Sequence, residues 1–381
     1  MVKKIEALEI KNGLNQFAIE LFLTLGDSNK AKNIFFSPYS IFSAFALAYE
    51  GSMGKTRKEI QGVLHFSDNE VLRKKYLVYH NWITQKKTPF ELQMGNALWI
   101  QGKFPLLDQF VQVVSTNYGG TVKYLDFVNE GEKSRQTIND FIKDATRGHI
   151  TNLIPPKSLK PMTRLIITNA IYFHGDWEQA FDPMRTRLGQ FHLSPEKTIT
   201  IPMMTHGEES FNYKKFDDVE ILELPYKGNQ ISMYVLLPTH DISTFESSLS
   251  IDKFEKWKNE LVTTKLKPIM LPKFKFQSKF FLKKTLQSMG MLSCFHRTKA
   301  NFSQITTEDG VFIDNVIHQA VIAIDEQGTE AAAATSLQMT GKSKKRLKPR
   351  FIADHPFIFV IQDHIVGNIL FMGKMMDPTQ L

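Results

Sequence analysis

The sequence is poor in cysteine, since Cys294 is the only one among 381 residues. One thiol cannot form an internal disulfide, but this leaves the cellular compartment open. No run of 18 apolar residues occurs either, so a membrane-spanning helix is not expected. With 42% hydrophobic and 12% aromatic residues, the chain nevertheless has ample material for a large core.

Motifs of metal, nucleotide and hydrolase chemistry are also missing. None of the eleven histidines lies in an HExxH setting, and there is no CxxC pair, EF-hand loop, P-loop, GxGxxG or GxSxG. A Ser/His/Asp triad is non-local and escapes a motif search, but no residue pattern favours one. The sequence therefore predicts no metal site and gives no support to hydrolase chemistry.

Positive charge is in excess, with 47 Lys and Arg against 39 Asp and Glu and a formal net charge of +8. This excess indicates either a polyanionic or acidic partner or a merely soluble basic surface. Residues 1–25 show no apolar run behind a basic start, and their apolar spacing is typical of an amphipathic helix. We expect a secreted protein whose leader is missing from this sequence, with a cytoplasmic protein as the alternative.

Helical patterns dominate the first third of the chain and strand patterns the remainder. The predicted helices are 55–64, 71–83, 135–145 and 250–261, and the predicted strands are 90–100, 165–173, 190–193, 198–203, 219–224, 231–237, 269–276, 316–324, 356–362 and 369–374. Because there is little strand–helix–strand alternation, the sequence predicts an α+β fold with large antiparallel or mixed sheets. Composition marks no domain boundary.

One C-terminal stretch combines a strand pattern with a basic end. The strand-like run 320–324 leads into an acid, a glycine and small residues, which alternate with period two over 329–340. One face is small and then apolar, with Leu337 and Met339, and the other is small or polar. A basic cluster follows that no sheet interior would accept. The segment is therefore suited to be exposed first and inserted later.

The basic run 342–350 has three interpretations. It is a nucleic-acid or nuclear-localisation patch, a solvated loop, or a protease recognition site, because Lys and Arg fill the acid-floored pocket of trypsin-like proteases. Taken alone it favours a solvated loop, and the strand pattern directly before it shifts the balance towards a protease site.

Two further basic groups either bind a sulfated glycan by charge matching or form solvated helix faces. The first group is Arg73, Lys74, Lys75, Lys86 and Lys87; the second is Lys253, Lys256, Lys258, Lys265 and Lys267. Glu255 and Glu260 dilute the second group. The sequence leaves both alternatives open.

Seven segments, taken in order, resemble the serpin family over essentially the whole chain. They are Asn33–Ser40 (NIFFSPYS), 138–150, Thr168–Trp177 with Phe181, Leu222–Tyr226, Leu271–Phe274, Val316–Val321 and Phe371–Lys374. An eighth, Asp325–Ala334, resembles the hinge of the family's reactive-centre loop.

The resemblance implies a single domain over residues 1–381 with three β-sheets, eight or nine helices and an exposed reactive-centre loop at 326–350. It also implies a protease inhibitor rather than an enzyme. A protease cleaves the loop and forms an acyl-enzyme, and the loop then inserts into the main sheet and drags the protease with it. No cofactor is required, although a heparin-like glycan is a candidate accelerator.

The hinge carries residues that suit insertion. They are Glu326, Gly328, Thr329, Glu330, Ala331, Ala332, Ala333 and Ala334. The glycine gives backbone freedom, and neither proline nor charge lies on the inward face from 329 to 339. This intact hinge favours an inhibitor over a non-inhibitory serpin that acts as a carrier or binding protein.

Counting along the hinge as inhibitory serpins are spaced puts the reactive bond between Lys342 and Ser343. Alternative cleavage points follow at Lys344, Lys345 and Arg346. The small–basic–Ser sequence at the bond resembles that of antithrombin-like serpins, which implies a trypsin-like protease held in a covalent complex. General similarity suggests an invertebrate serpin of an extracellular immune cascade.

The resemblance also assigns residues that control how the main sheet opens. Ser37, Ser40, Asn169 and His318 match a polar cluster beneath the sheet, and Trp177 matches the point where the loop first enters. Buried polar groups must be hydrogen-bonded, so losing one should ease opening or destabilise the sheet. We expect a monomer whose partner is the protease, without membrane or nucleic acid.

Overall fold

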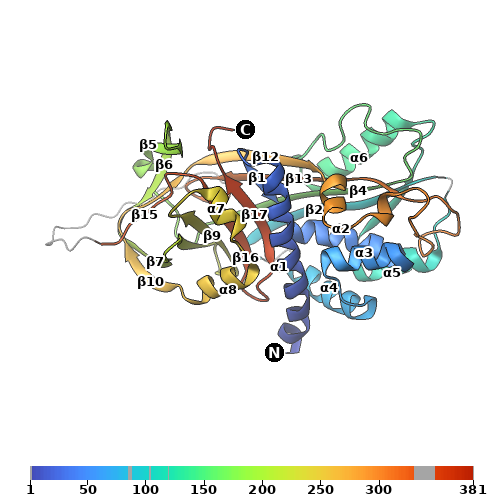
Figure 1. Ribbon diagram of the computed structural model, residues 1–381, viewed down its shortest axis with the longest axis horizontal. Helices are drawn as coiled ribbons and strands as arrows, with labels where there is room; N and C mark the ends of the chain where they lie inside the picture. Colours follow the sequence, from blue (N-terminus) through green and yellow to red (C-terminus); the bar gives the residue numbers. More distant parts are fainter. Residues whose placement is uncertain (1, 85–87, 103, 119, 330–347, 381) are drawn as a thin grey trace.

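The structure, a computed structural model, describes residues 2–84, 88–102, 104–118, 120–329 and 348–380. These residues form nine α-helices, and α2 to α6 gather at one end of the molecule (Figure 1). The helices are α1 (Val2–Ser28), α2 (Pro38–Gly51), α3 (Gly54–Leu64), α4 (Asn69–Ile83), α5 (Asp108–Tyr118), α6 (Gly131–Ala145), α7 (Ile242–Ser247), α8 (Ile251–Asn259) and α9 (Lys283–Ser288). None of them is long and apolar enough to span a membrane.

The main sheet contains the line where β13 and β4 meet, which we call the seam. Its strands, in spatial order, are β12 (Phe274–Phe281), β13 (Ile313–Ile324), β14 (Gly328–Thr329), β4 (Leu165–Asp176), β2 (Phe90–Gln101) and β3 (Thr121–Leu125). Strands β13 and β4 pair directly and in parallel as far as Val321 and Tyr172. Beyond that point the two-residue strand β14 lies between them and is antiparallel to both.

Two further sheets complete the fold. The seven-stranded sheet has the order β1 (Ile34–Phe36), β17 (Ile369–Met375), β16 (Phe357–Asp363), β9 (Ile231–Pro238), β8 (Val219–Pro225), β7 (Glu209–Lys215) and β10 (Val262–Leu266). The four-stranded sheet has the order β15 (Phe351–Ile352), β11 (Ile269–Pro272), β6 (Lys197–His206) and β5 (Arg187–Ser194). The α+β prediction with three sheets is therefore confirmed.

Helix α2 lies in the core between sheets, and every one of its residues is buried. Ser37 caps its first turn by accepting a hydrogen bond from the Ser40 amide, and Pro38 has the backbone angle that a helix start requires. A second, smaller core lies between the main sheet and α6, where Ile138 and Ile142 pack over Trp99 and Ile317. The sheet is thus covered on both faces where the seam runs.

One predicted strand, 269–276, is wrong as a single element. The chain breaks at Lys273, so that β11 joins the four-stranded sheet and β12 joins the main sheet. Alternating apolar residues continue across the break, with Leu271 and Phe274 both buried. Periodicity therefore gave no sign that the two halves belong to different sheets.

Candidate functional site

Two residues of the predicted hinge form the short strand β14, at the end of the seam where β13 and β4 no longer pair directly. Gly328 pairs with Asp176, and Thr329 pairs with Gly175 on β4 and with Ile324 on β13. A Cβ atom on Gly328 would overlap the carbonyl oxygen of Gly175 and lie 2.7 Å from the Asp176 Cα. Only glycine fits this close approach between backbones.

Trp177 holds the chain that leads into β14. Its backbone amide donates to the Gln327 carbonyl over 2.7 Å, and its indole Nε1 donates to the Asp325 carbonyl over 3.0 Å. The Phe181 amide donates to the Glu326 carbonyl over 2.7 Å. Three successive carbonyl groups before β14 are therefore satisfied from one segment, and the structure places Trp177 directly after β4, at that end of the main sheet.

The Glu326 side chain fastens the same segment to the four-stranded sheet. It accepts hydrogen bonds from the Thr186 hydroxyl over 2.8 Å and from the Lys273 ammonium over 2.7 Å. Burial would raise the pKa of the Glu326 carboxyl, but the hydrogen bonds from Lys273 and Thr186 lower it below its ordinary value. Glu326 is 8% exposed, so the clasp is a nearly buried ionic contact.

The Thr329 side chain points into the core beneath the seam. Its hydroxyl lies 2.9 Å from the Tyr226 hydroxyl, and the Tyr226 ring stacks on Trp177 with centroids 4.6 Å apart. Thr329 is 2% exposed. Because side chains alternate along a strand, residues 331, 333 and 335 would face the same core if β14 were extended.

A polar cluster, defined as Ser37, Ser40, Asn96, Asn169 and His318, lies further along the seam. His318 on β13 stands opposite Asn169 on β4, and their side chains hydrogen-bond through Nδ1 and Oδ1. The Ser37 amide donates to Nε2 of His318 over 3.1 Å, which leaves the ring proton on Nδ1 for Asn169. This contact bridges the two strands that must separate if a strand enters between them.

The rest of the polar cluster ties the seam to α2. The Asn169 amide nitrogen donates to the Ser40 hydroxyl over 2.6 Å, and the Ser37 hydroxyl donates to the Leu370 carbonyl over 2.7 Å. Asn96, which sequence reasoning missed, accepts from the Ser40 hydroxyl over 3.1 Å. Its position between Gly95 and Ala97 in a strand pattern carried no signal of a polar contact.

Complete burial lowers the pKa of His318 to about 3, so its imidazole is neutral at physiological pH. A neutral ring has one donor and one acceptor, and the polar cluster uses both. The resemblance had grouped Ser37, Ser40, Asn169 and His318, and the structure links these four residues in one hydrogen-bond network.

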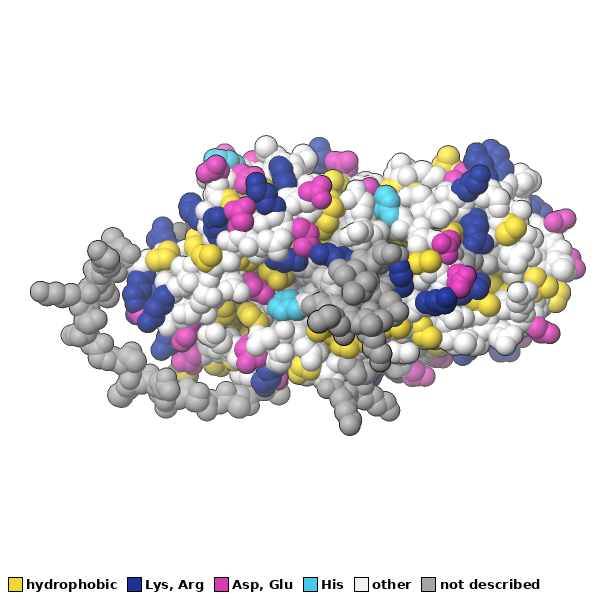
Figure 2. Space-filling model, turned by 90° about the horizontal axis from the view of Figure 1, so that it is seen from below, with side chains coloured by type: hydrophobic (Ala, Val, Ile, Leu, Met, Phe, Trp, Pro, Cys, Tyr) yellow, Lys and Arg dark blue, Asp and Glu magenta, His cyan; other side chains and the backbone are white. Residues whose placement is uncertain are grey.

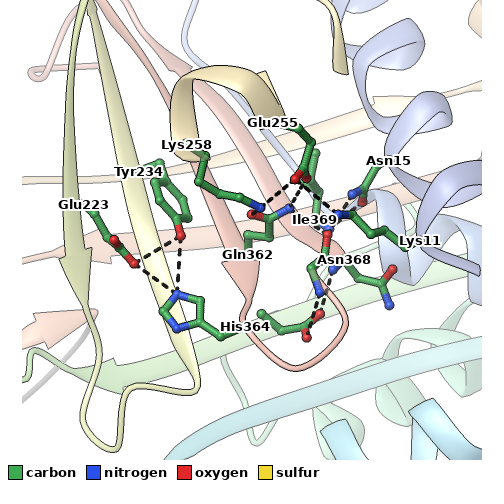
Figure 3. Close-up of polar contacts among 12 residues, drawn as sticks. Lys11, Asn15, Glu223, Tyr234, Glu255, Lys258, Gln362, His364, Asn368 and Ile369 are labelled. Carbon is green, nitrogen blue, oxygen red and sulfur yellow. Dashed lines mark hydrogen bonds and ion pairs between the residues drawn. The ribbon is translucent and has the colours of Figure 1, made fainter. Parts of the chain in front are cut away.

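Most of the described basic residues offered as glycan ligands have acidic partners. Arg73 forms two hydrogen bonds with the buried carboxylate of Glu50, at 2.8 and 2.6 Å, and Lys74 pairs with Glu70. Figure 3 shows Lys258 facing Glu255 and Gln362. Lys265 and Lys267 both contact Glu208, while Lys253 and Lys256 on α8 are exposed.

Several predicted site residues lie outside the described residues. They are Glu330, Ala331, Ala332, Ala333, Ala334, Lys342, Ser343, Lys344, Lys345 and Arg346 in the loop, and Lys86 and Lys87 after α4. Among the residues that the structure describes, no group of three or more His, Cys, Asp or Glu could hold a metal ion.

The family model described as "Serpin (serine protease inhibitor)" matches residues 12–378. The chain is a serpin. It is 38% identical to an uncharacterised serpin-like protein of Methanosarcina mazei over 98% of this chain and 88% of that protein. It is 32% identical to human leukocyte elastase inhibitor over 97% of this chain and all of that protein.

Solved serpin structures share the whole fold. Human thyroxine-binding globulin in complex with thyroxine has a TM-score of 0.90 at 28% identity, over 98% of this chain and all of that chain. Uncleaved ovalbumin has a TM-score of 0.87 at 27% identity, over 97% and 100% of the two chains. These relatives thus include a protein named as an inhibitor and a protein named for binding thyroxine.

Proposed function

We propose that this serpin is a suicide inhibitor of a trypsin-like serine protease that is cleaved between Lys342 and Ser343. The observation that carries the proposal is β14, because Gly328 and Thr329 already occupy the first two positions of a strand between β13 and β4. The direction of β14 is therefore the direction that an inserted loop would follow along the seam.

Insertion would continue the register that β14 begins. Counting on from Thr329 opposite Gly175 and Ile324, Thr335 would stand opposite both Asn169 and His318. The Asn169–His318 contact would open, and a threonine hydroxyl would arrive where two polar groups lose their partner. Each added backbone hydrogen bond contributes about 1 kcal/mol, so a strand of ten residues supplies a large driving force.

The mechanism requires the loop to insert faster than the acyl-enzyme is hydrolysed. After cleavage the protease remains esterified to the carbonyl of Lys342, and the freed end of the loop is drawn into the sheet with the protease attached. Displacement to the far end of the seam distorts the protease before water can release it. The small residues at 331–334 favour fast entry, because they need little space between the strands.

We place this inhibitor in an extracellular proteolytic cascade, as a secreted protein, with a cytoplasmic role as the alternative. A sulfated glycan such as heparin is the proposed accelerator. The exposed Lys253 and Lys256 support glycan binding, whereas the bidentate Arg73–Glu50 pair speaks against Arg73 as a glycan ligand. Invertebrate immunity is a more specific setting for which the fold offers no support.

The direct test is incubation with trypsin followed by denaturing electrophoresis. We expect an SDS-stable complex, and Lys342→Ala should lose it because the specificity pocket then has no basic side chain to bind. Lys344→Ala is the matched control and should keep the complex. Loss with Lys344→Ala and retention with Lys342→Ala would move the reactive bond downstream.

A carrier is the second candidate. A cavity of about 640 Å³ lies between α1 and α8 and is lined by Lys11, Asn15, Gln16, Ile251 and Glu255. Figure 3 shows Lys11 and Asn15 facing this region from α1, with Lys11 paired to Glu255 over 3.2 Å. If trypsin cuts the loop and stays fully active, the inhibitor proposal fails and the carrier becomes the better candidate.

A further inference from the structure

A cluster of lysines surrounds one carboxylate close to where the loop rejoins the fold. Glu208, between β6 and β7, contacts Lys265 at 2.8 Å and Lys267 at 3.6 Å, and it also pairs with Lys348. These lysines come from β10, from the turn after it, and from the segment that precedes β15. Three separate elements thus bring positive charge to one place, which we call the lysine cluster.

The lysine cluster keeps a positive balance despite its central acid. Lys265, Lys267, Lys348 and the exposed Arg350 stand against Glu208 and Glu209, an excess of two positive charges. The side chains of Lys265 and Lys267 are 59% and 48% exposed, so their charges face solvent. Figure 2 shows Lys and Arg side chains side by side at the end of the molecule that carries β7, β10 and β15.

Chain length places this cluster beside the reactive bond, whatever path the loop takes. Lys348 follows Lys342 by six positions, and a fully extended chain spans at most about 20–22 Å over that length. A protein–protein contact of ordinary size covers about 800 Å² on each partner, a patch roughly 30 Å across. A protease that grips the bond therefore brings its own surface over or next to the lysine cluster.

Resting on the proposed function, we infer that the lysine cluster is a second contact surface for the target protease and that it selects proteases with acidic residues beside the active site. Charges around a binding site mainly raise the association rate, and they lose their effect as salt screens them.

The test compares the anionic and cationic forms of pancreatic trypsin, which share specificity for Lys and Arg. We expect faster association with anionic trypsin at 50 mM salt. Lys265→Gln/Lys267→Gln should slow that reaction about three- to tenfold, and the effect should shrink below about twofold at 1 M salt. Lys58→Gln/Lys299→Gln removes two exposed charges elsewhere and should leave the rate within about 1.5-fold.

A reciprocal variant separates charge from structure. Glu208→Gln removes the acid and should speed association with anionic trypsin, whereas a merely structural role would slow it or leave it unchanged. Equal rates for all variants, with SDS-stable complexes still formed, would overturn this inference and leave the proposed function intact. Absence of any complex would overturn the proposed function itself.

Binding to heparin distinguishes a glycan-binding site from a contact surface for the protease. If Lys265→Gln/Lys267→Gln loses retention on heparin-agarose while its trypsin rates stay at the wild-type values, the surface binds a glycan and the inference is overturned. Loss of the trypsin rate advantage with unchanged heparin retention supports it.

Discussion

At the scale of single residues, the segment before β14 is held by side chains that lie far apart in the sequence. No sequence pattern predicted that they would meet. Glu326 was expected in the hinge from resemblance alone, but its partners Lys273 and Thr186 come from elements 53 and 140 residues away in the chain. Such pairs depend on tertiary placement, and no local pattern encodes them. Ser37 was likewise named from resemblance, and helix α2, which Ser37 caps, was not predicted from the sequence.

The Glu326 clasp gives a first prediction about stability. Glu326→Ala should lower the free energy of unfolding by about 1–3 kcal/mol, since it removes two hydrogen bonds to a nearly buried carboxylate. The partial exposure of Lys273 keeps the figure towards the low end. Urea unfolding measures the effect, and a double-mutant cycle with Lys273→Ala isolates the pair. The exposed Glu308→Ala serves as control, and an equal loss in both variants would contradict the clasp.

His318 gives a prediction about pH. Because burial lowers its pKa from 6.5 to about 3, the folded state keeps the ring neutral while the unfolded chain protonates it below pH 6.5. The contribution of His318 to stability is therefore complete above pH 6.5. It is lost as pH falls towards 3, by up to about 1.4 kcal/mol per unit.

The measurement is the difference in unfolding free energy between wild type and His318→Gln, followed from pH 8 to pH 4. Other groups titrate in both proteins and cancel in the difference. We expect a constant difference above pH 6.5 and a decreasing one below it. A difference that does not change with pH would show that the ring is not neutral and buried as described.

At the scale of elements, the proposed insertion depends on the seam between β13 and β4, where the backbone of β4 lies very close to Gly328. Gly328→Ala should hinder insertion, because the added methyl group would meet the backbone of Gly175 and Asp176. We expect more inhibitor to be consumed per trypsin molecule, by several-fold, as cleaved loop is released before trapping. Titration of residual trypsin activity gives this ratio.

Gly62→Ala is the matched control, since a methyl group there meets no atom within 4 Å. A glycine inside helix α3 costs up to about 1 kcal/mol relative to alanine, so this variant should be slightly more stable and inhibit normally. If Gly328→Ala consumes no more inhibitor per trypsin molecule than the wild type does, this position does not need a glycine.

Secondary structure followed from the sequence wherever periodicity was long and uninterrupted. Helices α3 and α4 and strands β2, β4 and β13 lie where the pattern put them. The division between β11 and β12 did not follow, because the same alternation serves two sheets. Nor did Asn96 or the pairing of Arg73 with Glu50, since both depend on which elements meet in space.

At the scale of the whole molecule, the proposed mechanism requires the protein with a cleaved loop to be more stable than the uncleaved protein. Cleavage by a protease that is not trapped should raise the unfolding temperature by on the order of 10 °C or more. A new strand of about ten residues adds about 1 kcal/mol for each backbone hydrogen bond. Differential scanning calorimetry before and after cleavage measures it. An unchanged unfolding temperature would mean that the loop stays out of the sheet.

The pairing of β1 with β17 has a consequence for how this molecule is made. Strand β1 ends at Phe36 and β17 begins at Ile369, so the two edges that meet are separated by 332 residues. At translation rates of about 5–20 residues per second, β1 waits roughly 20–60 s on the ribosome for its partner. Residues 326–350, the predicted reactive-centre loop, are also synthesised before β17. The main sheet and this segment are therefore both present on the ribosome before the last strand of the seven-stranded sheet has been made.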